Sequence, residues 1–112
     1  MAQLALHITE SARARIAEVL SSRDPGSVVA LMYGGSETYG ADGALKERKP
    51  YHWQFQVYPK AHAEALERDY SSRGITLLYK LGEITLCIPQ TQFIDQLRGR
   101  TLDFEAGAVV VE

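Results

Sequence analysis

Strict alternation of apolar and polar side chains between Tyr51 and Val57 is the feature of this sequence that most constrains its fold. The apolar members are aromatic or β-branched, and polar side chains separate them: Tyr51, Trp53, Phe55 and Val57 alternate with His52, Gln54 and Gln56. Successive side chains of a β-strand point to opposite faces, so this stretch predicts a strand with one face on a core and the other in water. The strand therefore belongs to a sheet that has a buried face.

Helical and extended segments alternate along the rest of the chain. Thr9 is a good N-cap for a helix whose apolar residues recur at helical spacing until a turn at residues 24–26. The apolar run 27–33 predicts a buried strand, and Pro59 suits the first turn of a helix that ends before Gly74. Further predictions are a hairpin of strands 75–81 and 84–88, a short helix over 91–97, and one or two terminal strands at 102–104 and 108–111.

Composition predicts one globular domain. The length of 112 residues is near the commonest domain size, and the apolar and charged fractions, 46% and 23%, are ordinary for a globular protein. The sequence contains no run of about 18 apolar residues, the length needed to cross a membrane. Its opening segment has neither the basic leader nor the apolar stretch typical of a secretory signal. We therefore expect residues 1–112 to form one α+β domain in the cytoplasm, where the single cysteine, Cys87, stays reduced.

Charge and glycine spacing argue against nucleic-acid and nucleotide binding. The formal net charge is −2 with the two signs interspersed, which gives no electrostatic footprint for a phosphate backbone. The four glycines between Gly34 and Pro50 match no phosphate-binding motif, and no Lys-Ser/Thr pair follows them. We expect neither a nucleic-acid nor a membrane partner.

The segment from Gly34 to Pro50 is predicted to be a long surface loop. It carries mixed charges and shows no apolar period, and it is longer than most connections in compact domains. Tyr39 and Tyr51 flank this loop, where they belong either to the core or to an interface, since tyrosine is enriched at protein interfaces. The candidate interaction residues are Gly34, Gly35, Ser36, Tyr39 and Tyr51.

Cys87 and His52 are weak candidates for metal ligands. Cys87 shares one face of a predicted strand with Thr85, and free cysteine is among the most buried residue types. The alternative is a thiol that a partner chain reaches, which ligates metal across a dimer or is oxidised. His52 follows the loop on the polar face of its strand, where an exposed or hydrogen-bonded strand residue is the simpler interpretation. The histidines show no metal-ligand spacing.

The sequence gives little support for catalysis. A nucleophilic Ser36 needs His52 as base and Asp42 as orienter, and the G-x-S-x-G elbow is absent. Glu37, with Asp42 and His52, is the nearest candidate for any other small enzyme. We therefore do not expect an enzyme.

Two stretches of the chain carry a family resemblance: residues 8–16 with the strand 28–32, and residues 84–88 with the closing segment 97–104, which reads Gly-x-x-Leu-Asp-Phe from Gly99. In order and spacing they resemble HesB/IscA-like proteins, the A-type iron–sulfur carriers. The resemblance implies a compact β-sandwich or flattened barrel of mixed strands, with two to three helices and a helix packed at each end. Residues 41–72 have no counterpart in it.

The resemblance does not imply that this chain has the activity of the carriers. Carriers hold a cluster with a cysteine in a Gly-Gly-Cys-Ser-Gly-like loop and with a Cys-Gly-Cys-like tail, whereas this chain has Ser36 in the loop and ends at Glu112 before any such tail. Neutral serine is a poor cluster ligand. We therefore predict a non-enzymatic binding or assembly domain without a cofactor, which meets a protein partner or a second copy. The alternative is a divergent iron or iron–sulfur protein that uses Cys87 across a dimer.

Overall fold

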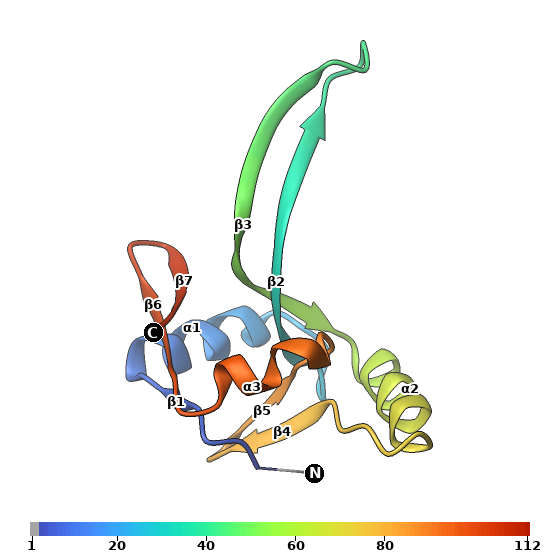
Figure 1. Cartoon of the computed structure of the whole chain (residues 1–112), viewed down its shortest axis with the longest axis vertical. Coiled ribbons are helices and arrows are strands. Elements are labelled where there is room, and N and C mark those ends of the chain that lie inside the picture. The colour runs from blue at the N-terminus through green and yellow to red at the C-terminus, as the bar shows by residue number, and fades with distance from the viewer. Residues whose placement is uncertain (1–2) are drawn as a thin grey trace.

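A computed structural model describes residues 3–112, which form an α+β domain with two separate sheets (Figure 1). The elements are β1 (His7–Ile8), α1 (Glu10–Ser21), β2 (Val28–Tyr39), β3 (Leu45–Tyr58), α2 (Lys60–Ser71), β4 (Leu78–Leu81), β5 (Ile84–Cys87), the 3-10 turn η1 (Thr91–Phe93), α3 (Ile94–Leu97), β6 (Thr101–Glu105) and β7 (Ala108–Val111). The strand orders are β3-β2-β5-β4 and β1-β6-β7, each sheet mixing parallel and antiparallel pairs. The described strands do not close into a barrel, so the mixed α+β class is confirmed and the flattened-barrel alternative is wrong.

The four-stranded sheet is covered on both faces. On one face, Val29, Leu31 and Leu86 pack in the main core, to which α1, α3 and the three-stranded sheet also contribute. On the other face, Ala30 and Cys87 pack with side chains of α2 in a second, smaller cluster. The predicted helix after Pro59 is therefore confirmed, and it covers the sheet face that carries the single thiol.

The first helix begins where the sequence predicts. The Thr9 hydroxyl oxygen accepts a hydrogen bond from the backbone N–H of Ala12 at 3.2 Å, which caps α1. The same hydroxyl donates to the Asp103 carboxylate on β6 at 2.6 Å. One side chain thus caps the helix and ties it to the three-stranded sheet.

Replacing Thr9 by Ala is expected to destabilise the fold by about 1 kcal/mol, the usual cost of losing an N-cap. The Thr9 bond is the largest of the hydrogen bonds that lower the pKa of Asp103. A carboxylate whose pKa is lower in the folded than in the unfolded state stabilises the fold at pH values above its unfolded-state pKa. This stabilisation is lost as the pH falls through the folded-state pKa. The Thr9→Ala loss, measured by urea unfolding, should therefore be larger at pH 7 than at pH 3. Thr9→Ser keeps both bonds and serves as the control; an equal loss in that variant would contradict this account.

The predicted loop between Gly34 and Pro50 is wrong, because most of this segment is strand. β2 and β3 pair antiparallel from Val28 opposite Tyr58 outward to Tyr39 opposite Leu45, with two irregularities on the way. A tight turn at residues 40–44 joins them. The outer half of this hairpin, residues 33–52, forms an arm that rises away from the rest of the domain (Figure 1). No apolar period marks it in the sequence because almost all of its outer side chains are exposed.

The remaining elements follow the predictions closely. β4 and β5 form the expected hairpin with a two-residue turn at Gly82, whose φ of 67° favours glycine, although β4 begins at Leu78 rather than at residue 75. The terminal strands are β6 and β7, while the two-residue β1, parallel to β6, was not predicted. Within residues 3–112, every helix is too short or too polar to cross a bilayer.

Candidate functional site

The arm stands out in the described chain because it has no core of its own. β5 pairs with β2 only at Val29 and Ala30, so farther out the ribbon has two strands. The large apolar side chains exposed in the described part of the protein all lie on the arm: Tyr39 is 58% exposed, Leu45 46% and Tyr51 73%. A two-stranded hairpin alone is marginally stable in water, so the arm lacks packing that a sheet normally receives.

Aromatic rings and one side-chain amide pack and hydrogen-bond at the base of the arm. The Tyr33 ring packs against Trp53 at 5.0 Å between centroids and against Phe93 at 5.5 Å. The Gln90 amide donates to the Tyr33 carbonyl at 2.9 Å, and its oxygen accepts from the Tyr33 N–H at 2.6 Å. β5 no longer pairs with β2 at this position. The side-chain amide of Gln90 takes the place of β5 by bonding both backbone groups of Tyr33.

The predicted interaction residues are all placed on the arm. Gly35 lies where a Cβ would stand 2.9 Å from the Lys49 carbonyl oxygen and 2.9 Å from a Tyr51 ring carbon, so a side chain does not fit there without movement. Gly34 has more room, and Ser36 is paired with Lys49 across the ribbon. The close approach at Gly35 lets the Tyr51 ring lie against the backbone of β2.

The tip of the arm is ordered by polar contacts between its own side chains. Arg48 forms an ion pair with Glu37 at 3.0 Å. The Tyr39 hydroxyl donates a hydrogen bond to the same carboxylate, which raises the pKa of Tyr39. Tyr39 also pairs across the ribbon with Leu45. The tip therefore presents an aromatic and an aliphatic side chain in a defined arrangement.

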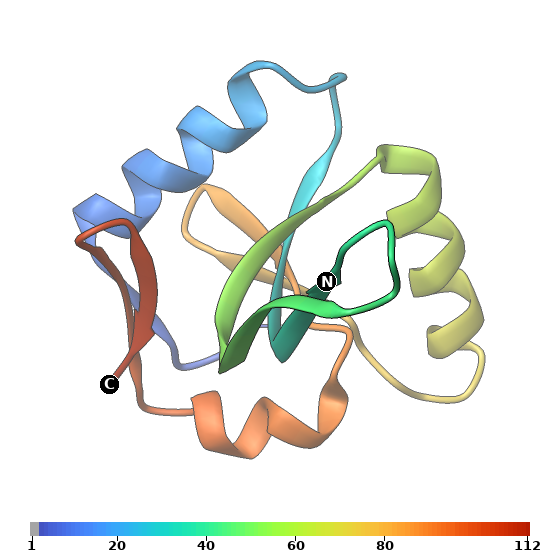
Figure 2. The same ribbon diagram turned by 90° about the horizontal axis from the view of Figure 1, so that it is seen from above.

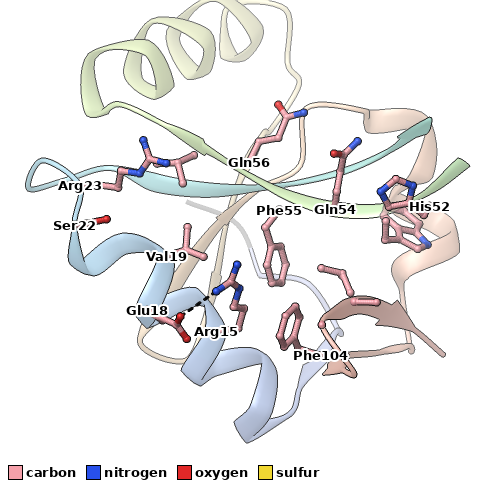
Figure 3. A pocket seen from close by; sticks show the side chains of 15 residues that line it. Arg15, Glu18, Val19, Ser22, Arg23, His52, Gln54, Phe55, Gln56 and Phe104 are labelled. Carbon is pink, nitrogen blue, oxygen red and sulfur yellow. Dashed lines mark hydrogen bonds and ion pairs between the residues drawn. The ribbon is translucent and has the colours of Figure 1, made fainter. Parts of the chain in front are cut away.

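A groove of about 940 Å³ opens at the base of the arm, between α1, β3 and the β6–β7 hairpin (Figure 3). Phe55 and Phe104 point into it, and the Arg15 guanidinium lies 5.3 Å from the centre of the Phe104 ring. Arg15 is paired with Glu18 at 3.1 Å, whereas Arg23 lines the groove with no ion pair to any described residue. The groove is thus apolar at its floor and carries one uncompensated positive charge.

The edge of β3 that borders the groove has unpaired backbone groups. The Tyr33 N–H and carbonyl both bond Gln90, so they point away from β3. In an antiparallel ladder the residues alternate between pairs that exchange hydrogen bonds and pairs that do not. Tyr33 lies opposite Trp53, so the backbone groups of Trp53, and of Phe55 and Val57 in the same register, point outward from the sheet. β3 is the edge strand of its sheet, and although β7 lies beside it no ladder joins the two, so this row has no strand partner within residues 3–112.

The candidate catalytic residues are not brought together. Asp42 accepts a hydrogen bond from the Ala44 N–H in the turn at the tip. His52 Nδ1 lies 2.7 Å from the Pro50 carbonyl oxygen, and Ser36 is paired with Lys49. The described hydrogen bonds join none of these three side chains to another. Residues 3–112 also contain no cluster of three or more histidine, cysteine, aspartate or glutamate side chains positioned to hold a metal.

Cys87 is buried, as the simpler interpretation of the sequence predicted. Its side chain packs with Ala30 and Leu77 under α2 and is 1% exposed. Burial, and to a smaller extent the nearby Glu67 carboxylate, raises the pKa of the Cys87 thiol to about 11. The thiol is therefore almost entirely protonated at neutral pH, whereas metal binding and oxidation need the thiolate.

Cys87 in the native protein is expected to react with a thiol reagent at least about 100-fold more slowly than an exposed cysteine, because both access and thiolate are lacking. The exposed control is Ser72→Cys, at the end of α2. Stopped-flow labelling in buffer and in denaturant measures both rates. Native labelling of Cys87 at the rate of the introduced cysteine would contradict the burial described here.

The interaction residues predicted from the sequence lie on the arm, whereas the groove was not predicted. Its residues come from three distant parts of the chain, and Phe55 was assigned to the core because it alternates with polar neighbours. Comparison with protein-family models, curated proteins and solved structures finds no match for this chain. Function is therefore inferred from the geometry of the arm and of the groove.

Proposed function

We propose that this chain is a non-enzymatic binding or assembly domain that meets another protein through its arm. The observation that carries the proposal is an ordered two-stranded arm whose exposed apolar side chains, Tyr39, Leu45 and Tyr51, have no core to pack on. Such a ribbon is marginal by itself, and its open strand edges are templates for pairing. A protein surface that covers the arm supplies the packing it lacks.

The tip has the properties of an interface anchor. Tyrosine buries a large area at a low cost in side-chain entropy and is enriched at protein interfaces. The bond to Glu37 holds the Tyr39 ring before binding, and the ion pair with Arg48 holds Glu37 in turn. Preorganisation of this kind lowers the entropy lost on association.

The proposal includes a HesB/IscA-like scaffold that carries no cluster. It is supported by the order of elements on which the resemblance rests, namely α1 followed by β2, and β5 followed by a short helix and β6. The donor set does not fit an iron–sulfur cluster, because Cys87 is buried with a raised pKa and Ser36 lies on the exposed arm. A cytoplasmic location completes the proposal, supported by the lone reduced thiol.

The double substitution Tyr39→Ser with Leu45→Ser tests the proposal. It removes the apolar tip without touching the core, so thermal unfolding of the dilute, monomeric chain should be nearly unchanged, while capture of protein partners by the tagged chain should fall at least about tenfold. The matched control is Ala61→Ser with Ala65→Ser on the exposed surface of α2. Unchanged partner capture together with an unchanged native mass would contradict the proposal.

The cluster-free part of the proposal has its own test. After purification without oxygen and attempted reconstitution, the chain is expected to hold less than stoichiometric iron and acid-labile sulfide and to show no visible absorption band. Stoichiometric iron that is lost on Cys87→Ser would contradict it and favour the divergent cluster protein.

A further inference from the structure

We infer that the partner of the arm is a second copy of this chain, in a two-fold dimer in which the tip of each arm occupies the groove at the base of the other. This inference rests on the proposed function, because it names the protein that the arm meets. It follows from what the groove can accept and from what the tip presents.

The groove is suited to an extended segment of protein. Its β3 wall offers the outward-pointing backbone groups of Trp53, Phe55 and Val57, which another strand can pair with. Its floor offers the Phe55 and Phe104 rings (Figure 3). Addition of a strand to an open edge, with side chains filling neighbouring apolar pockets, is a recurring mode of peptide recognition. The occupant therefore needs an open strand edge and exposed apolar side chains.

The tip of the arm meets these requirements, and one of its charges, that of Asp42, complements the groove. Tyr39 and Leu45 form an exposed apolar pair on a two-stranded ribbon with open edges. Asp42 lies in the turn beyond them and has no ion pair with any described residue. Arg23, which lines the groove, also forms no ion pair with any residue that the structure describes. An Asp42 carboxylate brought to the Arg23 guanidinium of a second copy compensates both charges.

The position of the groove along β3 makes the contact reciprocal. The arm occupies residues 45–52 of β3, a span of roughly 24 Å at about 3.4 Å per residue, and the groove begins at His52 on the same strand. Two arms that run antiparallel, side by side, therefore bring each tip to the groove of the other chain. From above, α1 and the β6–β7 hairpin stand on one side of the arm and α2 on the other (Figure 2).

Two-fold symmetry repeats the contact between tip and groove, so the dimer contains it twice, as in other isologous interfaces. A standard stable interface buries about 1,600 Å² in total, so each contact between a tip and a groove has to supply about 800 Å² counted over both chains. The groove alone does not supply this area, so the two arms, lying side by side, have to contribute the rest.

Sedimentation equilibrium of the whole chain, with a charge exchange, tests this inference. The unmodified chain is expected to be a dimer. Arg23→Asp and Asp42→Arg should each weaken dimerisation at least about tenfold, because each places like charges together in both contacts. The variant with both substitutions should dimerise within about threefold of the unmodified chain, since the pair is restored with its signs exchanged. Arg68→Asp on the exposed surface of α2 is the charge-reversal control.

The results separate this inference from the proposed function. A chain that stays monomeric up to millimolar concentration, but captures another protein through Tyr39 and Leu45, overturns the second copy as partner and leaves the binding role of the arm standing. A dimer that neither Arg23→Asp nor Asp42→Arg weakens also overturns it, as does a dimer that both weaken and that the variant with both substitutions does not restore. A monomer whose partner capture does not depend on the tip overturns both.

Discussion

Leu86→Ala is expected to lower the free energy of unfolding by about 2–5 kcal/mol, the range for removing a fully buried leucine side chain from a packed core. Leu86 is 0% exposed in β5, between its strand neighbours β2 and β4, and it packs in the main core that joins the two sheets. The loss combines the transfer free energy of the side chain with the cavity that rigid neighbours leave open. Leu86→Ala is expected to lower the free energy of unfolding more than any other substitution proposed for this protein.

Leu45→Ala is the matched control for this substitution. It removes the same atoms from a site on the arm that is 46% exposed, so a change within about 0.5 kcal/mol is expected in protein dilute enough to be monomeric, where no partner covers Leu45. Urea unfolding followed by far-ultraviolet circular dichroism measures both. Equal losses in the two variants would mean that the arm is part of the cooperative core, contrary to the fold described here.

Gln90→Ala is expected to destabilise the protein by about 2 kcal/mol and to loosen the base of the arm. The substitution leaves both the Tyr33 N–H and the Tyr33 carbonyl without the partner they have in the folded chain, and an unsatisfied buried polar group costs about 1–3 kcal/mol. Tyr33 is only half-buried, so water recovers part of that cost. The effect reaches the arm because Tyr33 lies at the point where the arm leaves the rest of the domain.

Hydrogen exchange adds a local measurement to the unfolding experiment. The amide of Tyr33 should exchange faster in Gln90→Ala, whereas amides of α1 should change only by the loss in global stability. Gln92→Ala, two residues along on an exposed site, is the control. An unchanged Tyr33 amide would contradict the role of Gln90 as a substitute strand.

The elements that the sequence predicted are those whose burial is periodic. Thr9 marks the start of α1 because its hydroxyl caps the helix, and the alternation around Phe55 marks β3 because Trp53 and Phe55 turn toward the core. The hairpin at Gly82 was predicted from turn chemistry, which is local. In each case the signal in the sequence is the physical cause of the structure.

The arm was missed because the cause of its structure is not local. Its strands continue a register set in the body, where Val29 lies opposite Val57, and they carry glycines and charges on exposed faces. An exposed ribbon needs no hydrophobic period, so its sequence resembles that of a loop. The groove was missed for a related reason: Arg23, Phe55 and Phe104 become neighbours only when α1 and the two sheets are assembled.

The most direct test of the central claim, that the tip of the arm contacts another protein chain, is photocrosslinking from the tip in the native protein. A photoreactive phenylalanine analogue is placed at Tyr39 and, as a control, at Ala65 on α2, both of which are exposed. The account predicts a defined crosslinked adduct from position 39 and none from position 65. The absence of an adduct at position 39, or equal adducts from both positions, would contradict it.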